Sequence, residues 1–268
     1  MRRNVIILTH GWTGSSVFTG LLGTAGYWLG AETMKKPDYD TFENQGLVEL
    51  NRKMMEELRL DQNHEHQFSR ETVLELERRA GGLDVAPYRA FVERCEAHTP
   101  WAWKDPRLTW TIRQWHPLLP ADRTAYIVLT RDDRQAWISA NLRRHVQSMA
   151  FTRAYNHGIT ASNISYLEER ALPYVRLSFE DLLLTPERTL ETLNDFLGLQ
   201  LGMDHLKSVF REPLYRKSRN LKDAVVASLI YWKNYGERDG RGRLGKAAAE
   251  GSSRGGQPLG GAAQTARR

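Results

Sequence analysis

The loop Thr9-His10-Gly11-Trp12-Thr13-Gly14-Ser15-Ser16 is the part of the sequence best suited to bind a phosphate group. The apolar run 5–8 before it predicts a strand, and residues 15–22 after it have the apolar spacing of a helix. A strand, a glycine loop and a helix in this order present successive backbone N–H groups to an anion. The alternative is a tight turn with no ligand. We expect an anion to be held by Gly11, Trp12, Thr13, Gly14, Ser15 and Ser16.

Two other catalytic loops fit this segment less well. Kinases and GTPases use G-x-x-x-x-G-K-[ST], and Ser15 stands where that lysine would be. An α/β-hydrolase needs G-x-S-x-G at a strand-to-helix turn, and the single match, residues 251–255, lies in a stretch without strand or helix patterning. A small-molecule kinase stays open as an alternative, and a hydrolase is disfavoured.

Charged residues also follow two later strand candidates. Arg131 comes directly after the apolar run 124–130, and Ser139 lies eight residues on, in the helix expected next. A phosphate there could bind the guanidinium fork and the hydroxyl together. Lys104 ends the candidate strand 101–104, and Arg107 follows it. The alternative for the first site is a solvent-exposed arginine and a serine on a helix surface, and for the second it is structural ion pairs.

The elements that must position these residues alternate between strand and helix. Apolar runs predict strands at 4–9, 101–104, 124–130 and 174–178. Helical spacing predicts helices at 15–22, 38–58, 70–97, 133–149 and 186–197. This order predicts an α/β fold, with a parallel sheet flanked by helices and ligands at the carboxyl ends of the strands.

These segments together resemble the sulfotransferase superfamily that uses 3′-phosphoadenosine 5′-phosphosulfate, particularly its bacterial and carbohydrate-type members. The resemblance covers residues 5 to about 199 and includes the glycine loop, Lys104-Asp105-Pro106-Arg107-Leu108, Arg131 with Ser139, and the segment 174–199. It implies a P-loop-NTPase-like fold, the phosphosulfate as co-substrate, and no metal. Trp12 stands where the family has a cation.

The resemblance also implies roles for individual residues. The loop would hold the 5′-phosphosulfate, and Arg131 and Ser139 the 3′-phosphate. Lys104 would neutralise the bridging oxygen of the leaving phosphate in place of the missing loop cation. Glu43, in a segment similar to the family's Y-F-E-D, would be the general base, with His10 as second choice. Independently of the resemblance, Arg216 in the late basic cluster 216–219 could close over the nucleotide, and a solvated surface cluster is the alternative.

The acceptor would be a hydroxyl or amine on a glycan, lipid or small molecule. Because position 12 lacks its cation, a nucleotide-binding module without turnover is a further alternative. The sequence does not predict an oligomeric state.

The composition narrows the functional class. The chain has 268 residues and a formal net charge of +6, of which residues 237–268 contribute +4 through seven Lys/Arg and three Asp/Glu. No basic stripe lies in the remainder, so we expect no nucleic-acid partner. The single cysteine, Cys95, excludes an intramolecular disulfide and indicates a reducing compartment. No apolar run reaches membrane length, and we expect a cytoplasmic protein.

Composition also predicts the domain boundary. Residues 1–236 should form a single domain, whereas 237–268 are rich in Gly, Ala and Arg, lack aromatic residues and should form a disordered tail. His64-Glu65-His66 offers no third ligand nearby in the sequence, and we therefore predict no metal site there.

Overall fold

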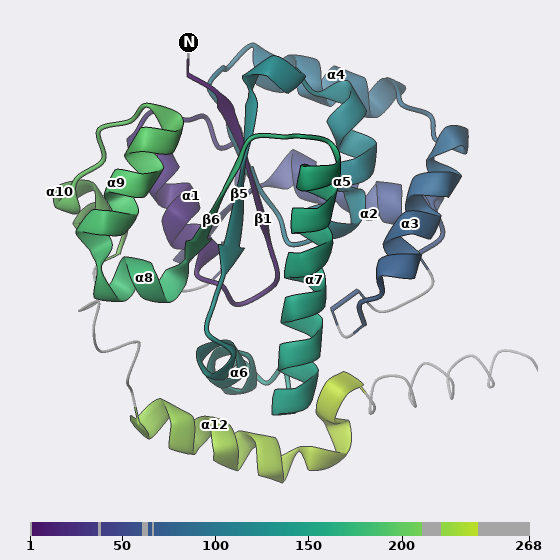
Figure 1. Ribbon diagram of the computed structural model, residues 1–268. Helices are drawn as coiled ribbons and strands as arrows, with labels where there is room; N and C mark the ends of the chain where they lie inside the picture. Colours follow the sequence, from purple (N-terminus) through teal and green to yellow (C-terminus); the bar gives the residue numbers. More distant parts are fainter. Residues whose placement is uncertain (1, 37–38, 61–63, 66, 211–220, 241–268) are drawn as a thin grey trace, which may run out of the picture.

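A four-stranded parallel sheet forms the centre of the computed structural model, which describes residues 2–36, 39–60, 64–65, 67–210 and 221–240 (Figure 1). The strand order is β4-β1-β5-β6. The strands are β1 (Asn4–Thr9), β4 (Ala102–Lys104), β5 (Thr124–Thr130) and β6 (Tyr174–Ser178). The predicted α/β class and parallel sheet are confirmed.

The register of the sheet brings the carboxyl ends of the strands to one edge. Along β1 and β5 the pairing runs from Asn4 with Thr124 to Thr9 with Leu129. Residues on β1 alternate between two apolar clusters, with Ile6 in one and Val5 and Ile7 in the other. Because both faces of β1 are covered, its sequence is continuously apolar rather than alternating.

Helices cover both faces of the sheet, with α1, α9 and α10 on one side and α2, α3 and α5 on the other (Figure 1). The first layer contains α1 (Ser15–Thr24), α8 (Phe179–Leu184), α9 (Pro186–Leu197) and α10 (Met203–Val209). The second contains α2 (Gln45–Glu57), α3 (Arg70–Arg79), α4 (Ala86–Glu96), α5 (Leu108–Trp115) and α7 (Met149–Glu169).

Two further helices lie below the carboxyl edge of the sheet in the view of Figure 1. They are α6 (Asp133–Leu142) and α12 (Leu221–Lys233). Short 3-10 helices complete the described chain: η1 (Ala80–Gly82), η2 (His116–Leu118), η3 (Ala121–Arg123) and η4 (Tyr235–Gly240).

A hairpin replaces the first part of the helix predicted at 38–58. Strands β2 (Thr33–Lys36) and β3 (Tyr39–Asn44) pair antiparallel, and α2 begins only at Gln45. The Asn44 side chain accepts hydrogen bonds from the backbone N–H groups of Gly46 and Leu47. This N-cap fixes the start of the helix, so the predicted boundary was wrong by about two turns.

Two other predicted helices are also divided. The one at 70–97 is interrupted after η1 at Gly82, and α4 restarts at Ala86. The one at 133–149 ends at Leu142, and a separate helix, α7, begins at Met149 behind the Ser148 cap. Glycine disfavours a continuous helix at the first break, and Arg144, with φ of 60°, turns the chain at the second.

The described chain continues past the predicted boundary at 236. The backbone N–H of Asp239 donates to the Val146 carbonyl at 2.9 Å, and its carboxylate accepts from the Ser148 N–H at 2.7 Å. Residues 237–240 therefore pack against the start of α7, while 241–268 lie outside the described residues. Within the described part, no helix has the length and apolar character needed to cross a membrane.

Candidate functional site

The candidate site lies at the carboxyl edge of the sheet, where β1, β4, β5 and β6 end. The glycine loop follows β1, Lys104 ends β4, Arg131 follows β5, and Glu180 comes two residues after β6. Because β1 adjoins both β4 and β5, the loop lies between the two predicted cation positions. Ligands of α/β sheets bind at such an edge, where successive strands leave to opposite sides.

The glycine loop is a tight turn that leads directly into α1. The hydroxyls of Thr9 and Thr13 share a hydrogen bond, and Thr13 also donates to the His10 carbonyl at 3.3 Å. Gly14 is the N-cap of α1, with φ of 73°, and no side chain caps this helix. The first N–H groups of α1 thus keep their capacity to bind an anion.

Phe179 of α8 packs closely beneath this turn. A Cβ placed on Gly14 would lie 2.4 Å from Cδ2 of Phe179. Two features therefore require glycine at position 14: its left-handed backbone conformation and the neighbouring Phe179 ring, which leaves no room for a Cβ.

Arg131 ties the loop to the ends of β5 and β6. Its Nη1 donates to the Trp12 carbonyl at 2.5 Å, and its Nε lies 3.5 Å from Oε1 of Glu180. Burial lowers the pKa of Arg131, and the Glu180 carboxylate opposes this shift. Ser139 lies further along α6, half-buried, and among the described residues no hydrogen bond joins it to Arg131.

The Glu180 carboxylate has a part that the sequence did not indicate. Glu180 and Asp181 lie in the first turn of α8, and the Ser178 hydroxyl accepts from both of their backbone N–H groups. The Glu180 carboxylate accepts from the Asp132 N–H at 2.7 Å and faces Arg131. It therefore holds the loop after β5 against the start of α8.

Lys104 and Glu43 form a buried ion pair at the other side of the loop. Nζ of Lys104 lies 2.7 Å from Oε1 of Glu43, and the two side chains are 2% and 18% exposed. Burial lowers the pKa of Lys104, and the charge of Glu43 opposes this shift. The structure thus joins two residues that the sequence selected separately, a cation and a candidate base.

A second network surrounds this pair. Asp105 accepts from Nδ2 of Asn51 at 2.9 Å and from Nη1 of Arg107 at 2.9 Å. Oδ1 of Asn51 in turn accepts from the Thr111 hydroxyl at 2.7 Å and from Nε1 of Trp115 at 2.8 Å. The network anchors the end of β4 to α2 and α5, and so fixes the backbone that carries Lys104.

His10 is buried at the mouth of the loop. Its Nδ1 donates to the Gly11 carbonyl at 2.7 Å, because a carbonyl can only accept, and Nε2 is therefore the basic nitrogen. Burial lowers the pKa of His10 from 6.5 to about 4. The ring is neutral at pH 7 and a weak proton acceptor, which makes it less suitable as a general base than its type suggested.

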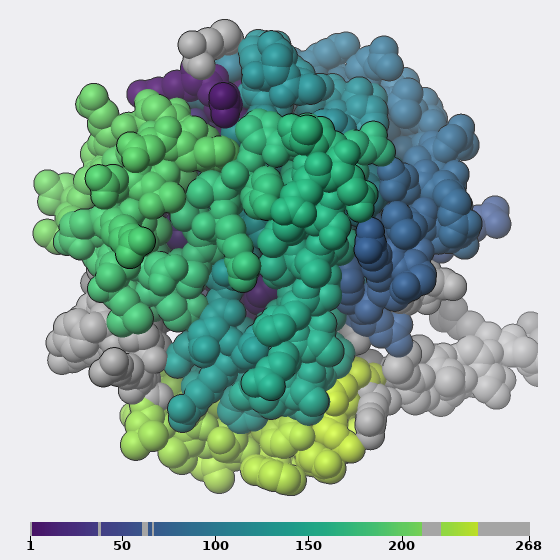
Figure 2. Space-filling model, viewed as in Figure 1, coloured from purple at the N-terminus to yellow at the C-terminus, as the bar shows by residue number. Residues whose placement is uncertain are grey.

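A cavity of about 680 Å³ opens beside Arg131 and His10. Arg176, Ser178 and Glu180 line it from the sheet edge, and α7 contributes Asn156, His157 and Thr160 among others. Figure 2 shows a depression between α6, α7 and α8 in which purple atoms of the N-terminal part are visible. The polar lining reaches both the loop and Arg131, so a polar ligand fits here.

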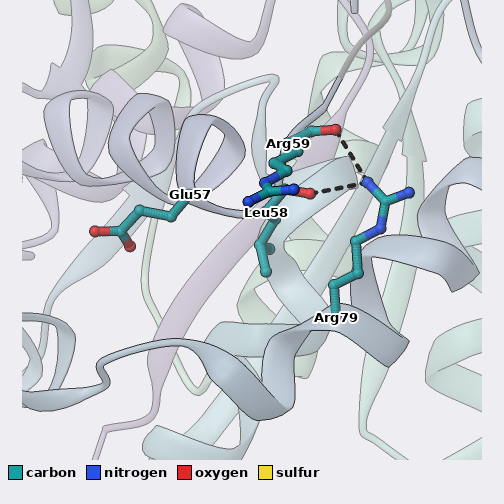
Figure 3. Close-up of a pocket in the computed structure, with 4 residues that line it drawn as sticks. All are labelled: Glu57, Leu58, Arg59 and Arg79. Atoms are coloured by element: carbon teal, nitrogen blue, oxygen red, sulfur yellow. Dashed lines mark hydrogen bonds between the residues drawn. The ribbon is translucent and has the colours of Figure 1, made fainter.

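A second cavity, of about 520 Å³, lies at the end of α2 (Figure 3). Nη1 of Arg79 donates to the carbonyls of Leu58 and Arg59 at 3.1 and 3.0 Å. These bonds satisfy carbonyls at the end of a helix, and the arrangement is structural.

Two sequence predictions concern residues outside this site. Arg216, in the range 211–220, lies outside the described residues. His66 also lies outside them. Of the described residues, no three His, Cys, Asp or Glu are grouped so that they could hold a metal ion.

Comparison with solved structures finds nine similar chains, and two of them are sulfotransferase domains. The "Sulfotransferase Domain from the Synechococcus PCC 7002 Olefin Synthase" is 18% identical with a TM-score of 0.48, over 85% of this chain and 94% of that chain. The "Sulfotransferase Domain from the Curacin Biosynthetic Pathway" is 16% identical with a TM-score of 0.47, over 84% and 82%. The sequence matches no family model and no curated protein. At this degree of similarity, function has to be inferred from the site residues themselves.

Proposed function

We propose that the protein is a sulfotransferase that moves a sulfuryl group from 3′-phosphoadenosine 5′-phosphosulfate to a hydroxyl or amine. The observation that carries the proposal is the Lys104–Glu43 pair beside a glycine loop that lacks the kinase lysine. The register places Lys104 next to Ile7, two residues before β1 ends. A base, a cation and an anion-binding loop therefore lie at one edge of the sheet, and these groups suit transfer of a charged group between two oxygens.

In this mechanism Glu43 accepts the proton of the acceptor as the acceptor oxygen or nitrogen attacks sulfur. The bond between sulfur and the bridging oxygen breaks, and 3′-phosphoadenosine 5′-phosphate leaves. The N–H groups at the start of α1 bind the leaving phosphate. As Glu43 becomes neutral, Lys104 loses its counter-charge. Its positive charge then stabilises the negative charge that develops on the leaving phosphate.

The 3′-phosphate would bind at the end of β5. Arg131 is the candidate there, and its present contact with the Trp12 carbonyl links nucleotide binding to the shape of the loop. Ser139 would add its hydroxyl from α6. The acceptor class and cytoplasmic location remain part of this proposal, as does the boundary of the C-terminal tail.

Nucleotide binding tests the proposal against a kinase. The thermal midpoint should rise more with 3′-phosphoadenosine 5′-phosphate than with magnesium-ATP, because Arg131 and Ser139 suit a 3′-phosphate and the loop lacks the kinase lysine. A ligand at 100 times its Kd stabilises the folded state by about 2.7 kcal/mol. A larger rise with magnesium-ATP would support the small-molecule kinase. Binding of the sulfotransferase nucleotide without transfer from labelled donor to any acceptor in a mixed lysate would support a non-catalytic module.

The base assignment is tested by Glu43→Gln. Donor affinity should stay near that of the wild type, while kcat falls by about 10² to 10⁴, the usual cost of losing general base catalysis. Glu49→Gln is the matched control, since this carboxylate lies on the exposed face of α2 and bonds only Gln45 in the described structure. Equal kcat in both variants would exclude Glu43 as the base.

A further inference from the structure

A cluster of cations and aromatic rings covers the side chain of Trp12, and we call Trp12, Lys36, Tyr39 and Arg143 the Trp12 cluster. Nζ of Lys36 lies 5.8 Å from the centre of the Trp12 ring, and Cζ of Arg143 lies 5.5 Å from it. The same two cations lie 6.0 and 5.3 Å from the Tyr39 ring. Two positive side chains therefore share one aromatic surface that belongs to the glycine loop.

The members of the Trp12 cluster come from three separate parts of the chain. Lys36 ends β2, and Tyr39 begins β3, the strand that pairs with it. Arg143 directly follows α6, and its Nη1 donates to the Tyr39 hydroxyl at 3.2 Å. The hairpin and the end of α6 thus meet at the Trp12 side chain of the glycine loop.

The charges of this cluster are available to a ligand. Both cations are exposed, and neither forms an ion pair with a carboxylate in the described part of the chain. Cation–aromatic contacts at exposed positions are weaker than charge-assisted hydrogen bonds to phosphate. An anion bound in the loop can therefore draw both side chains away from the ring at little cost.

Lys104 and Arg131, the two cations that follow from the strand ends, are already engaged. Lys104 is 2% exposed and bound to Glu43, and Arg131 holds the Trp12 carbonyl and faces Glu180. The loop itself carries Trp12 and has no lysine or arginine between residues 9 and 16. The phosphosulfate, which carries at least two negative charges, lacks a positive partner from the loop.

We propose that Lys36 and Arg143 supply the positive charge at the 5′-phosphosulfate that the loop lacks at position 12. This inference rests on the proposed function and names two further binding residues for its donor. Trp12 then serves as the surface that holds both cations near the loop before the donor binds.

The test uses two pairs of neighbouring cations. The variant Lys36→Gln/Arg143→Gln removes the charges over Trp12, and Lys35→Gln/Arg144→Gln removes the same charge from adjacent exposed positions. Affinity for 3′-phosphoadenosine 5′-phosphate is measured by titration calorimetry, and melting curves verify folding. We expect each single change at 36 or 143 to weaken binding about tenfold, the lower value for one charge-assisted hydrogen bond, and the control pair to change it little.

A restored loop cation provides the complementary measurement. Trp12→Lys, introduced into Lys36→Gln/Arg143→Gln, should recover most of the lost affinity. Equal binding by the two double variants would overturn the inference, as would a loss confined to the KM of the acceptor. If the wild type itself neither binds the nucleotide nor transfers sulfate, the proposed function fails instead, so the two failures are distinguishable.

Discussion

The buried histidine of the loop should make stability depend on pH. Burial lowers the pKa of His10 from 6.5 to about 4, so the unfolded chain binds a proton below pH 6.5 that the folded chain does not. Stability from this group is therefore complete above pH 6.5 and is lost as pH falls toward 4. Linkage gives a loss of about 2 kcal/mol between pH 7 and pH 5 from His10 alone.

Urea unfolding at pH 7 and pH 5 measures this contribution by difference. Other groups also respond to pH, since burial lowers the pKa of His64 and His116 as well, and the wild-type slope alone is not specific. His10→Gln should lose about 2 kcal/mol less than the wild type between the two pH values. At pH 7 it should be less stable by about 1 kcal/mol, because the hydrogen bond to Gly11 is lost or weakened.

His157→Gln is the control for this experiment, because its side chain is 67% exposed. Its pH dependence should follow that of the wild type. If His10→Gln also runs parallel to the wild type, His10 is charged or hydrated in the folded protein, and the reasoning from burial is refuted.

Three further predictions concern contacts around the site and the end of the chain. Asn51→Ala should lower the free energy of unfolding by about 3 kcal/mol, measured in urea, because Asp105, Thr111 and Trp115 each lose a buried partner. Arg79→Ala should cost about 1 kcal/mol in the same assay and leave nucleotide binding unchanged, since its bonds cap α2 and reach Glu75 on α3. Deleting residues 241–268 should leave the Tm unchanged, whereas Asp239→Ala should lower it by removing the bond to Ser148; a fall on deletion would move the domain boundary.

The strands β1 and β5 could be predicted because a strand buried on both faces has a continuously apolar sequence. β1 and β5 are covered on both faces, and each gives an unbroken apolar run of the right length. The hairpin was not predictable in the same way. β2 and β3 are short and mostly polar, and apart from Thr41 and Asn44 they lie partly or fully exposed, so no apolar alternation marks them.

The helix α7 was missed for a different reason. Its buried face includes Thr152, Asn156 and Asn163 besides Ile159 and Leu167. Polar side chains on the inward face hide the helical apolar stripe from the sequence. Some of this polarity belongs to the cavity, where Asn156 is a lining residue, so the feature that obscured the helix is part of the candidate site.

Residues at strand ends were identified from the sequence, but their partners were not. A strand followed by a charged residue places Lys104 and Arg131 at the edge whatever the tertiary contacts are. Which carboxylate meets each cation depends on segments far away, since Glu43 lies 61 residues before Lys104. The partners of Trp12 come partly from the unpredicted hairpin, which is why Lys36 could not be selected from sequence.

Gly14 of the glycine loop should be sensitive to substitution, and urea unfolding can test this. Gly14→Ala imposes a left-handed backbone on a residue with a Cβ, at about 1 to 2 kcal/mol, and forces the Phe179 ring to move. We expect a total loss of about 3 kcal/mol in urea unfolding. Gly11→Ala is the control, because its Cβ meets no described atom within 4 Å.

The ring contribution can be separated from the backbone contribution. Phe179→Leu alone should lower the free energy of unfolding, because it leaves a cavity under Arg131. When it is combined with Gly14→Ala, the loss in the double variant should be smaller than the sum of the two single losses by more than about 0.5 kcal/mol. Strict additivity would mean that the ring does not restrict the loop. Coupling between them would establish that α8, which also carries Glu180, supports the glycine loop from below.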